Sequence, residues 1–279
     1  DSKYKIKNLK FNSEIDLQNI TLNDIKFLKD FFPNIKDQLS LKNHKIDLNF
    51  EKNQLNINGS GETLYHDKKD LIFYKITKKD NLYNFETTVS LNQSLFEISF
   101  LNYKKKENLE AKINFKGNYI KGKKLNFNEI SINDKKNKIL FQNIFLGRNF
   151  KINKIDKVIL KYQDSNNKEN NLKISRNNKN YLMSSSIFNA SLFFDNLISS
   201  KNKKKIDIFN EDFKLSINMN KVYIDDNEYV TNVIGDLEIE KNKINKAEVT
   251  SEFTNKKKLK LTINSQGGQK ITTFFSAKA

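Results

Sequence analysis

The sequence predicts a mostly β protein, built on a long and predominantly antiparallel sheet with two short helices. Apolar and polar residues alternate along nearly the whole chain, as they do in strands that bury one face. Turn-forming clusters rich in Asn, Asp and Lys interrupt this alternation roughly every 10–15 residues, as hairpins require. Pro occurs once and Gly eight times, too rarely for a collagenous or Pro-rich disordered chain.

The alternation defines the expected strands in chain order. The first half carries clear runs at 46–50, 55–59, 83–91, 96–100 and 109–115. Shorter runs follow at 125–132, 139–146, 150–152, 158–162, 172–174 and 181–183. The last part adds runs at 213–219, 222–224, 237–239, 259–263 and 271–275. Together these segments predict roughly 16–20 strands.

Two segments have helical spacing instead. The first, near 22–39, has apolar residues three or four positions apart, with Thr21 as the expected N-cap and Pro33 breaking the run: Leu22, Ile25, Leu28, Phe32, Ile35 and Leu39. The second, 188–200, begins near the expected N-cap Asn189 and continues through Leu192 and Leu197. We therefore expect a β segment over 1–187, a helical connector over 188–200, and a further β segment over 201–279.

Each predicted strand has one apolar and one polar face. Most Phe residues fall in phase with the aliphatic residues, so they are expected to line the apolar side. The opposite faces are too charged to be buried by a second layer. A sandwich, a closed barrel and an open trough all remain compatible with this pattern.

The composition limits the possible chemistry. Lys and Arg total 50 against 33 Asp and Glu, giving a formal net charge of +17, yet only Arg148 and Arg176 are Arg. Such Lys, Asn, Ile and Phe usage is typical of an AT-rich genome, and nucleic-acid readout leans on Arg. We therefore expect no nucleic-acid partner, whereas an anionic membrane surface stays possible. The absence of Cys excludes disulfides and thiol chemistry.

No catalytic or metal-binding motif is recognisable. His44 and His66 are expected to be exposed polar residues, and the segment 59–61 (Gly-Ser-Gly) is expected to be a tight turn. The lysine runs at 104–106, 203–205 and 256–258 are expected to be solvated hairpin tips or linkers. The sequence thus predicts no enzyme, no cofactor and no metal.

Both ends of the chain resemble cut ends. The N-terminus lacks an initiator Met and a signal segment, and no window approaches the ~20 apolar residues that span a bilayer. We expect the chain to be a piece of a longer protein.

In residues 184–197 an expected strand ends in small residues and a short helix begins. This segment resembles a recurrent segment of the AsmA-like family of bacterial envelope proteins, of the YhdP and TamB type, with Asn189 where the family usually has Asp. The strand runs at 213–217, 222–224, 233–239, 259–263 and 267–271 are similar to the segment that follows it. Upstream, 31–33, 46–50 and 55–61 resemble the central region of the family.

This resemblance implies a fold and a function. The sheet would curl into an open, taco-like trough, and a transmembrane segment absent from this chain would anchor the protein in the inner membrane. The protein would then lie in the periplasm and conduct phospholipid between the inner and outer membranes. The partners would be phospholipid and both membranes, reached through missing parts of the protein. The expected groove-lining residues are Ile46, Leu48, Phe50, Tyr83, Phe85, Val89, Phe96, Ile98, Phe100, Ile113, Phe115, Leu215, Ile217, Leu261 and Ile263.

An alternative function does not involve lipid transport. A closed β-sandwich or solenoid would serve as an envelope scaffold or adhesive module, with the same apolar residues forming an ordinary core. A further alternative, nucleic-acid binding through the Lys excess, predicts an affinity that falls steeply with salt.

Overall fold

A computed structural model describes residues 9–35, 38–65, 67–192, 209–225, 227–266 and 269–277. The described residues fold mostly as β-strands, and sixteen strands are assigned to one large sheet. Among the strand pairs described within the two units, one is parallel and the others are antiparallel, which confirms the predicted mostly β, predominantly antiparallel fold. The chain divides into two compact units, residues 1–135 and 136–279.

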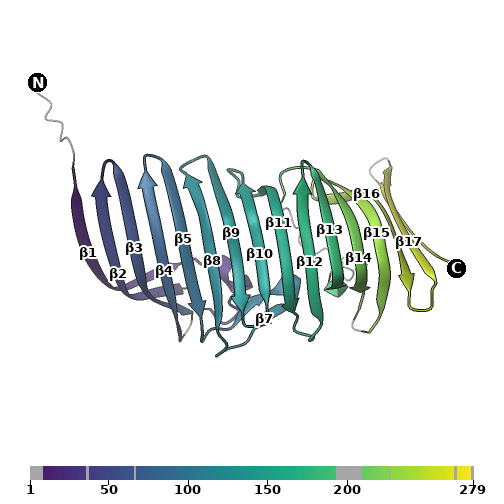
Figure 1. The fold of residues 1–279 in the computed structure, drawn as a ribbon, viewed down its shortest axis with the longest axis horizontal. Helices are drawn as coiled ribbons and strands as arrows, with labels where there is room; N and C mark the ends of the chain where they lie inside the picture. The colour runs from purple at the N-terminus through teal and green to yellow at the C-terminus, as the bar shows by residue number, and fades with distance from the viewer. Residues whose placement is uncertain are drawn as a thin grey trace, which may run out of the picture. The chain divides into compact units, whose positions relative to one another are not determined.

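Unit 1 (residues 1–135) contributes seven strands to the large sheet, in the order β1-β2-β3-β4-β5-β8-β9 (Figure 1). Two short strands, β6 and β7, form a separate hairpin that is inserted between β5 and β8. The strands are β1 (Phe11–Asn23), β2 (Gln38–Glu51), β3 (Gln54–Tyr65), β4 (Lys68–Lys79), β5 (Leu82–Leu91), β6 (Phe96–Ile98), β7 (Tyr103–Lys105), β8 (Ala111–Ile120) and β9 (Lys124–Asp134). Two 3-10 helices, η1 (Lys26–Asp30) and η2 (Ser99–Leu101), complete the unit.

Unit 2 (residues 136–279) contributes nine strands in sequence order. Among its described strand pairs, β13 and β14 are parallel and the others are antiparallel hairpins. The strands are β10 (Lys138–Leu146), β11 (Ile152–Gln163), β12 (Glu169–Asn177), β13 (Asn180–Asn189), β14 (Phe213–Tyr223), β15 (Tyr229–Glu240), β16 (Lys243–Phe253), β17 (Lys258–Gln266) and β18 (Gln269–Ala277).

Asn and Lys take the turn positions that Gly fills in many β proteins. Lys52 and Asn53 both have positive φ between β2 and β3, as do Lys241 and Asn242 between β15 and β16. Two successive positive-φ residues are the mark of a type I′ turn, whose twist matches that of the flanking strands. Asn tolerates this conformation better than most residues, so the chain closes its hairpins with few glycines.

The predicted helix near 22–39 is wrong. Leu22 and Leu39 lie in β1 and β2 and face each other directly in the register. Between them, Asp24 has φ +58, and only the five residues of η1 form a 3-10 helix. Ile25 is the N-cap residue of η1, so the predicted cap Thr21 does not serve: it lies within β1. The apolar side chains of 22–39 come from two strand ends and the connection between them, and together they imitate the spacing of a helix. Pro33 also limits any helix there.

The predicted second helix starts later than expected. Phe188 belongs to β13, whereas Ser191 and Leu192 are helical. Asn189 Oδ1 accepts a hydrogen bond from the backbone N–H of Ser191 (3.2 Å), which is the contact of an N-cap. The remaining residues of the predicted connector, 193–200, lie outside the described residues. The predicted boundary over 188–200 falls inside unit 2.

Candidate functional site

The strand registers of unit 1 place its apolar residues on one face of the sheet, here called the inner face. Three parallel rows cross the strands from β2 to β9, and their side chains are half-buried apart from the buried Gly117. We call these rows the apolar strip: Ile46, Gly59, Tyr74, Thr87, Phe115 and Ile130; Leu48, Ile57, Ile76, Phe85, Gly117 and Phe127; Phe50, Leu55, Lys78, Tyr83, Tyr119 and Leu125.

Aromatic rings make neighbour contacts along the strip. The rings of Phe85 and Phe127 meet edge to face with centroids 5.7 Å apart. Tyr83 and Tyr119 lie with centroids 6.0 Å apart, and Phe11 of β1 stacks on Phe50 at 5.4 Å. Within unit 1, the described strands outside the large sheet are only β6 and β7, so no second sheet of comparable size covers the strip there.

Two glycines within β3 make room for rings on this face. A Cβ built on Gly61 would overlap the imidazole of His44, and one on Gly59 would overlap the ring of Tyr74. The predicted tight turn at 59–61 is therefore wrong, because these residues lie inside a strand against which aromatic rings pack. His44 is also not exposed as predicted: its ring nitrogens lie 3.2 Å from Tyr74 Oη and 3.1 Å from the Glu62 carbonyl. His66 lies outside the described residues.

A small substructure covers the end of the inner face that the apolar strip does not reach. This cap consists of residues 24–35 and 92–110, which include η1, β6, η2 and β7. Its two parts are joined by a hydrogen bond from the Glu97 N–H to the Phe31 carbonyl (2.8 Å) and by an edge-to-face contact of Phe32 with Phe96. Its buried side chains include Phe32, Ile35, Phe96, Ile98 and Leu101.

The cap is attached to the sheet at three places. Phe32 stacks on Tyr65 of β3, with ring centroids 4.0 Å apart and planes within 5° of parallel. The hydroxyl of Tyr103 donates to the Asp134 carboxylate of β9 at 2.8 Å. The carboxylate of Asp70 on β4 accepts the backbone N–H groups of Asn92, Gln93 and Ser94 at 2.6, 2.9 and 3.1 Å.

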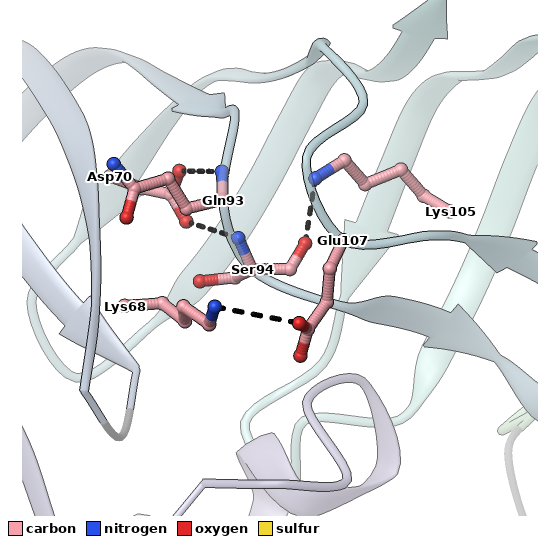
Figure 2. A network of polar contacts seen from close by, with 6 residues as sticks. All are labelled: Lys68, Asp70, Gln93, Ser94, Lys105 and Glu107. Carbon is pink, nitrogen blue, oxygen red and sulfur yellow. Dashed lines mark hydrogen bonds and ion pairs between the residues drawn. The ribbon is translucent and has the colours of Figure 1, made fainter.

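The third attachment contains two buried residues of opposite charge, Asp70 and Lys105. Figure 2 shows the backbone of Gln93 and Ser94 between Asp70 on one side and Lys105 on the other. Lys105 is 2% exposed, and its ammonium donates to the Ser94 carbonyl at 2.6 Å. Burial lowers the pKa of Lys105, while the negative charges of Asp70, Glu107 and Asp134 oppose that shift. The prediction that the run 104–106 is wholly solvated is therefore wrong for Lys105.

Beside this network, the cap and the sheet enclose a depression of about 410 Å³. Its walls are partly apolar, from Phe32, Ile35, Tyr65 and Leu95, and the ion pair of Lys68 with Glu107 (3.5 Å) lies at its edge (Figure 2). Burial raises the pKa of Tyr65 to about 12, so its phenol stays protonated at neutral pH.

The structure sorts the predicted groove residues into three groups. Six lie in the apolar strip and two, Val89 and Ile113, lie buried in the adjoining row of the same face; the six are Ile46, Leu48, Phe50, Tyr83, Phe85 and Phe115. Phe96, Ile98 and Phe100 belong to the cap instead, so the predicted continuation of the sheet over 96–100 is wrong. Phe96 and Ile98 are buried there, and Phe100 is 56% exposed on η2.

The third group lies in unit 2. Ile217 and Leu261 belong to one cross-strand row, through Gly235 and Val249. Leu215 and Ile263 belong to the next row, through Leu237 and Ala247. These four residues thus share the apolar face of unit 2, as the alternation predicts. A neighbouring row of that face is fully buried: Ile139, Leu160, Leu172, Ser185, Met219 and Val233.

The cap is the part of the site that sequence reasoning missed. Its signal was present in the short spacing of the strand run at 96–100 and in a charged segment too long for a simple turn, 104–110. Among the described residues, no group of three or more His, Asp or Glu side chains could hold a metal ion. No described helix is long and apolar enough to cross a membrane.

Comparisons with protein-family models, curated proteins and solved structures find no match to this chain.

Proposed function

We propose that the chain is part of an AsmA-like lipid-transfer protein of the YhdP and TamB type, and that its apolar strip carries the acyl chains of phospholipid. In this proposal the protein lies in the periplasm, is anchored in the inner membrane by a segment outside this chain, and passes lipid toward the outer membrane. It has no enzymatic role. The observation that carries the proposal is the continuity of the strip, which crosses six strands from β2 to β9 without a second sheet of comparable size on it within the described part of unit 1.

The chemistry of the strip suits an acyl chain better than a polar ligand. Aliphatic and aromatic side chains dominate its three rows, and the half-buried Lys78 is its one charged member. An acyl chain gains roughly 0.8 kcal/mol for each CH₂ group it buries, and it needs no directional hydrogen bonds. The rows also follow one another from strand to strand, so a chain could slide along them without a fixed binding pose.

Site-specific photo-crosslinking in cells tests the proposal. A photoreactive amino acid replaces Phe85 or Phe115 on the strip of the full-length protein, and Phe73 serves as the matched control. Phe73 lies on neighbouring β4 but faces the opposite side of the sheet and is 49% exposed. We expect crosslinks to phospholipid from Phe85 and Phe115, and none or far fewer from Phe73.

Two results would overturn the proposal. Equal lipid crosslinking from Phe73 would mean that the label reports only general exposure to membrane. No lipid crosslinking from either strip position, with the protein correctly folded and located, would favour the scaffold alternative, in which the same residues form a closed core.

A further inference from the structure

The face of β10, β11 and β12 opposite to the apolar rows carries four lysines, here called the lysine face: Lys138, Lys157, Lys161 and Lys173. Lys138 and Lys161 are directly opposite in the register of β10 and β11. Lys173 lies opposite Ile159, and Lys157 opposite Ser175, on the pairing of β11 with β12. Three of the four side chains are exposed and Lys157 is half-buried.

None of these four ammonium groups has an ion-pair partner in the part of the chain that the structure describes. Glu169 is diagonal to Lys161 in the register of β11 and β12, and Asp156, next to Lys157 in the sequence, pairs with Lys154 at 3.6 Å. Like charges directly opposite on a sheet destabilise the pairing of the two strands. Lys138 and Lys161 therefore impose a cost on the free protein that a negatively charged partner would offset.

Drift in base composition alone does not explain this face, because several lysines on other strands lie opposite carboxylates. In unit 1 the row Lys75, Glu86, Lys116 and Glu129 changes sign at every strand from β4 to β9, and Lys116 pairs with Glu86. In unit 2, Lys214 pairs with Glu238 at 2.9 Å and Lys260 with Glu248 at 2.6 Å. Carboxylates thus neutralise these lysines, whereas none forms an ion pair with the four lysines of β10–β12.

We propose that the lysine face docks on the headgroup layer of a membrane that contains anionic phospholipid. Four like charges spread over three neighbouring strands on one face suit an extended charged surface better than a single small anion. Leu182 of β13 adjoins the array through Ser175 and Lys157, and its aliphatic side chain is 50% exposed, so it can lie among headgroups. The face has no Arg and no exposed aromatic ring for bases to stack on, which favours lipid over nucleic acid.

This inference does not depend on the proposed lipid transfer, because it concerns the polar face of β10–β12 in unit 2 and not the apolar strip of unit 1. Vesicle co-sedimentation of the 279-residue chain tests it, with vesicles of phosphatidylcholine alone or mixed with phosphatidylglycerol. The test variant carries Gln at Lys138, Lys157, Lys161 and Lys173. The matched control carries Gln at Lys104, Lys116, Lys214 and Lys260, four lysines that form ion pairs. Both variants lower the formal net charge from +17 by four, to +13.

We expect the wild type to bind the vesicles that contain phosphatidylglycerol, and to bind them more weakly at higher salt. It should not bind the vesicles of phosphatidylcholine alone. Each lysine near an anionic surface contributes about fivefold to the partition constant, so the test variant should lose at least ~100-fold. The control variant should stay within ~10-fold of the wild type, because its lysines are already neutralised by carboxylates.

Two outcomes would overturn the inference. Equal losses in the two variants would mean that net charge alone, and not this face, drives binding. Tight binding of a single-stranded oligonucleotide, lost in the test variant while vesicle binding is absent, would assign the face to nucleic acid instead. Circular dichroism of both variants checks that the β structure is intact.

Discussion

At the scale of single residues, sequence reasoning failed where the identity of a buried neighbour decides the outcome. Gly59 and Gly61 read as a turn because Gly is the usual turn residue, yet they sit in β3 under Tyr74 and His44. Tyr74 lies 15 positions from Gly59, and His44 lies 17 positions from Gly61, so no local sequence pattern indicates these contacts. The burial of His44 was missed for the same reason.

Lys105 offers a pH-dependent prediction at this scale. Burial lowers its pKa in the folded chain below the ordinary value of 10.5. At pH values between the lowered pKa and 10.5, Lys105 is more fully protonated in the unfolded chain than in the folded chain. The free energy of unfolding therefore rises with pH in that window. We expect the free energy of unfolding of the wild type, relative to Lys105→Met, to increase from neutral pH toward pH 10.5.

Urea unfolding at a series of pH values measures this difference. Lys104→Met is the control, because Lys104 lies next to Lys105 in sequence but is exposed and pairs with Glu97 at 2.7 Å. A constant difference between the wild type and Lys105→Met over the whole window would show that burial of Lys105 does not disfavour its charged form.

At the scale of elements, the strands could be predicted and the cap could not. Alternation reports which face of a strand is buried, so it located most of the strands and placed eight groove candidates on one inner face of unit 1. Residues 22–39 defeated it because their apolar side chains pack from two strand ends and a turn, which imitates helical spacing. The cap likewise depends on contacts between segments far apart in sequence, 24–35 and 92–110.

The cap should loosen as one element when its anchor is weakened. Asp70→Asn replaces a carboxylate that accepts three backbone N–H groups by an amide with one acceptor oxygen and an NH₂ facing those donors. We expect a loss of about 3 kcal/mol in stability and faster hydrogen exchange over residues 92–110. Hydrogen exchange measured by mass spectrometry resolves the affected peptides.

Asp47→Asn is the matched control for this change, since Asp47 is exposed on β2 and its carboxylate makes no hydrogen bond or ion pair in the described part of the chain. If Asp70→Asn leaves hydrogen exchange over 92–110 unchanged, the carboxylate is not needed to hold the cap. The stacking of Phe32 on Tyr65 and the hydrogen bond of Tyr103 to Asp134 would then hold it.

At the scale of the whole molecule, the fold class followed from one repeated pattern, whereas function did not. Period-two alternation sustained over most of the chain leaves little besides a large antiparallel sheet. The same pattern fits an open face and a closed core, because both bury one side of each strand. An open face and a closed core differ in whether other segments of the chain cover the apolar face. Such segments have no strong periodic pattern in their sequence.

The division into units 1–135 and 136–279 predicts that damage stays local. Ile113→Ala removes a side chain that is 4% exposed on β8 and should cost unit 1 about 2–5 kcal/mol. Hydrogen exchange in increasing urea should then show earlier loss of protection in β3–β5 and β8, with β15 and β16 unchanged. An equal loss in both sets of strands would mean that the chain unfolds as one cooperative body.

The single parallel pair has a consequence for how the chain acquires its structure during synthesis. Antiparallel neighbours joined by short turns can zip together as soon as the second strand leaves the ribosome, because each closes only a small loop. β14 runs in the same direction as β13, so the chain must first traverse residues 190–212 and return to the starting end. Within unit 2, the pairing of β14 with β13 must therefore close a much longer loop than the hairpins do, and we expect the strands from β14 onward to join the sheet only after this slower step.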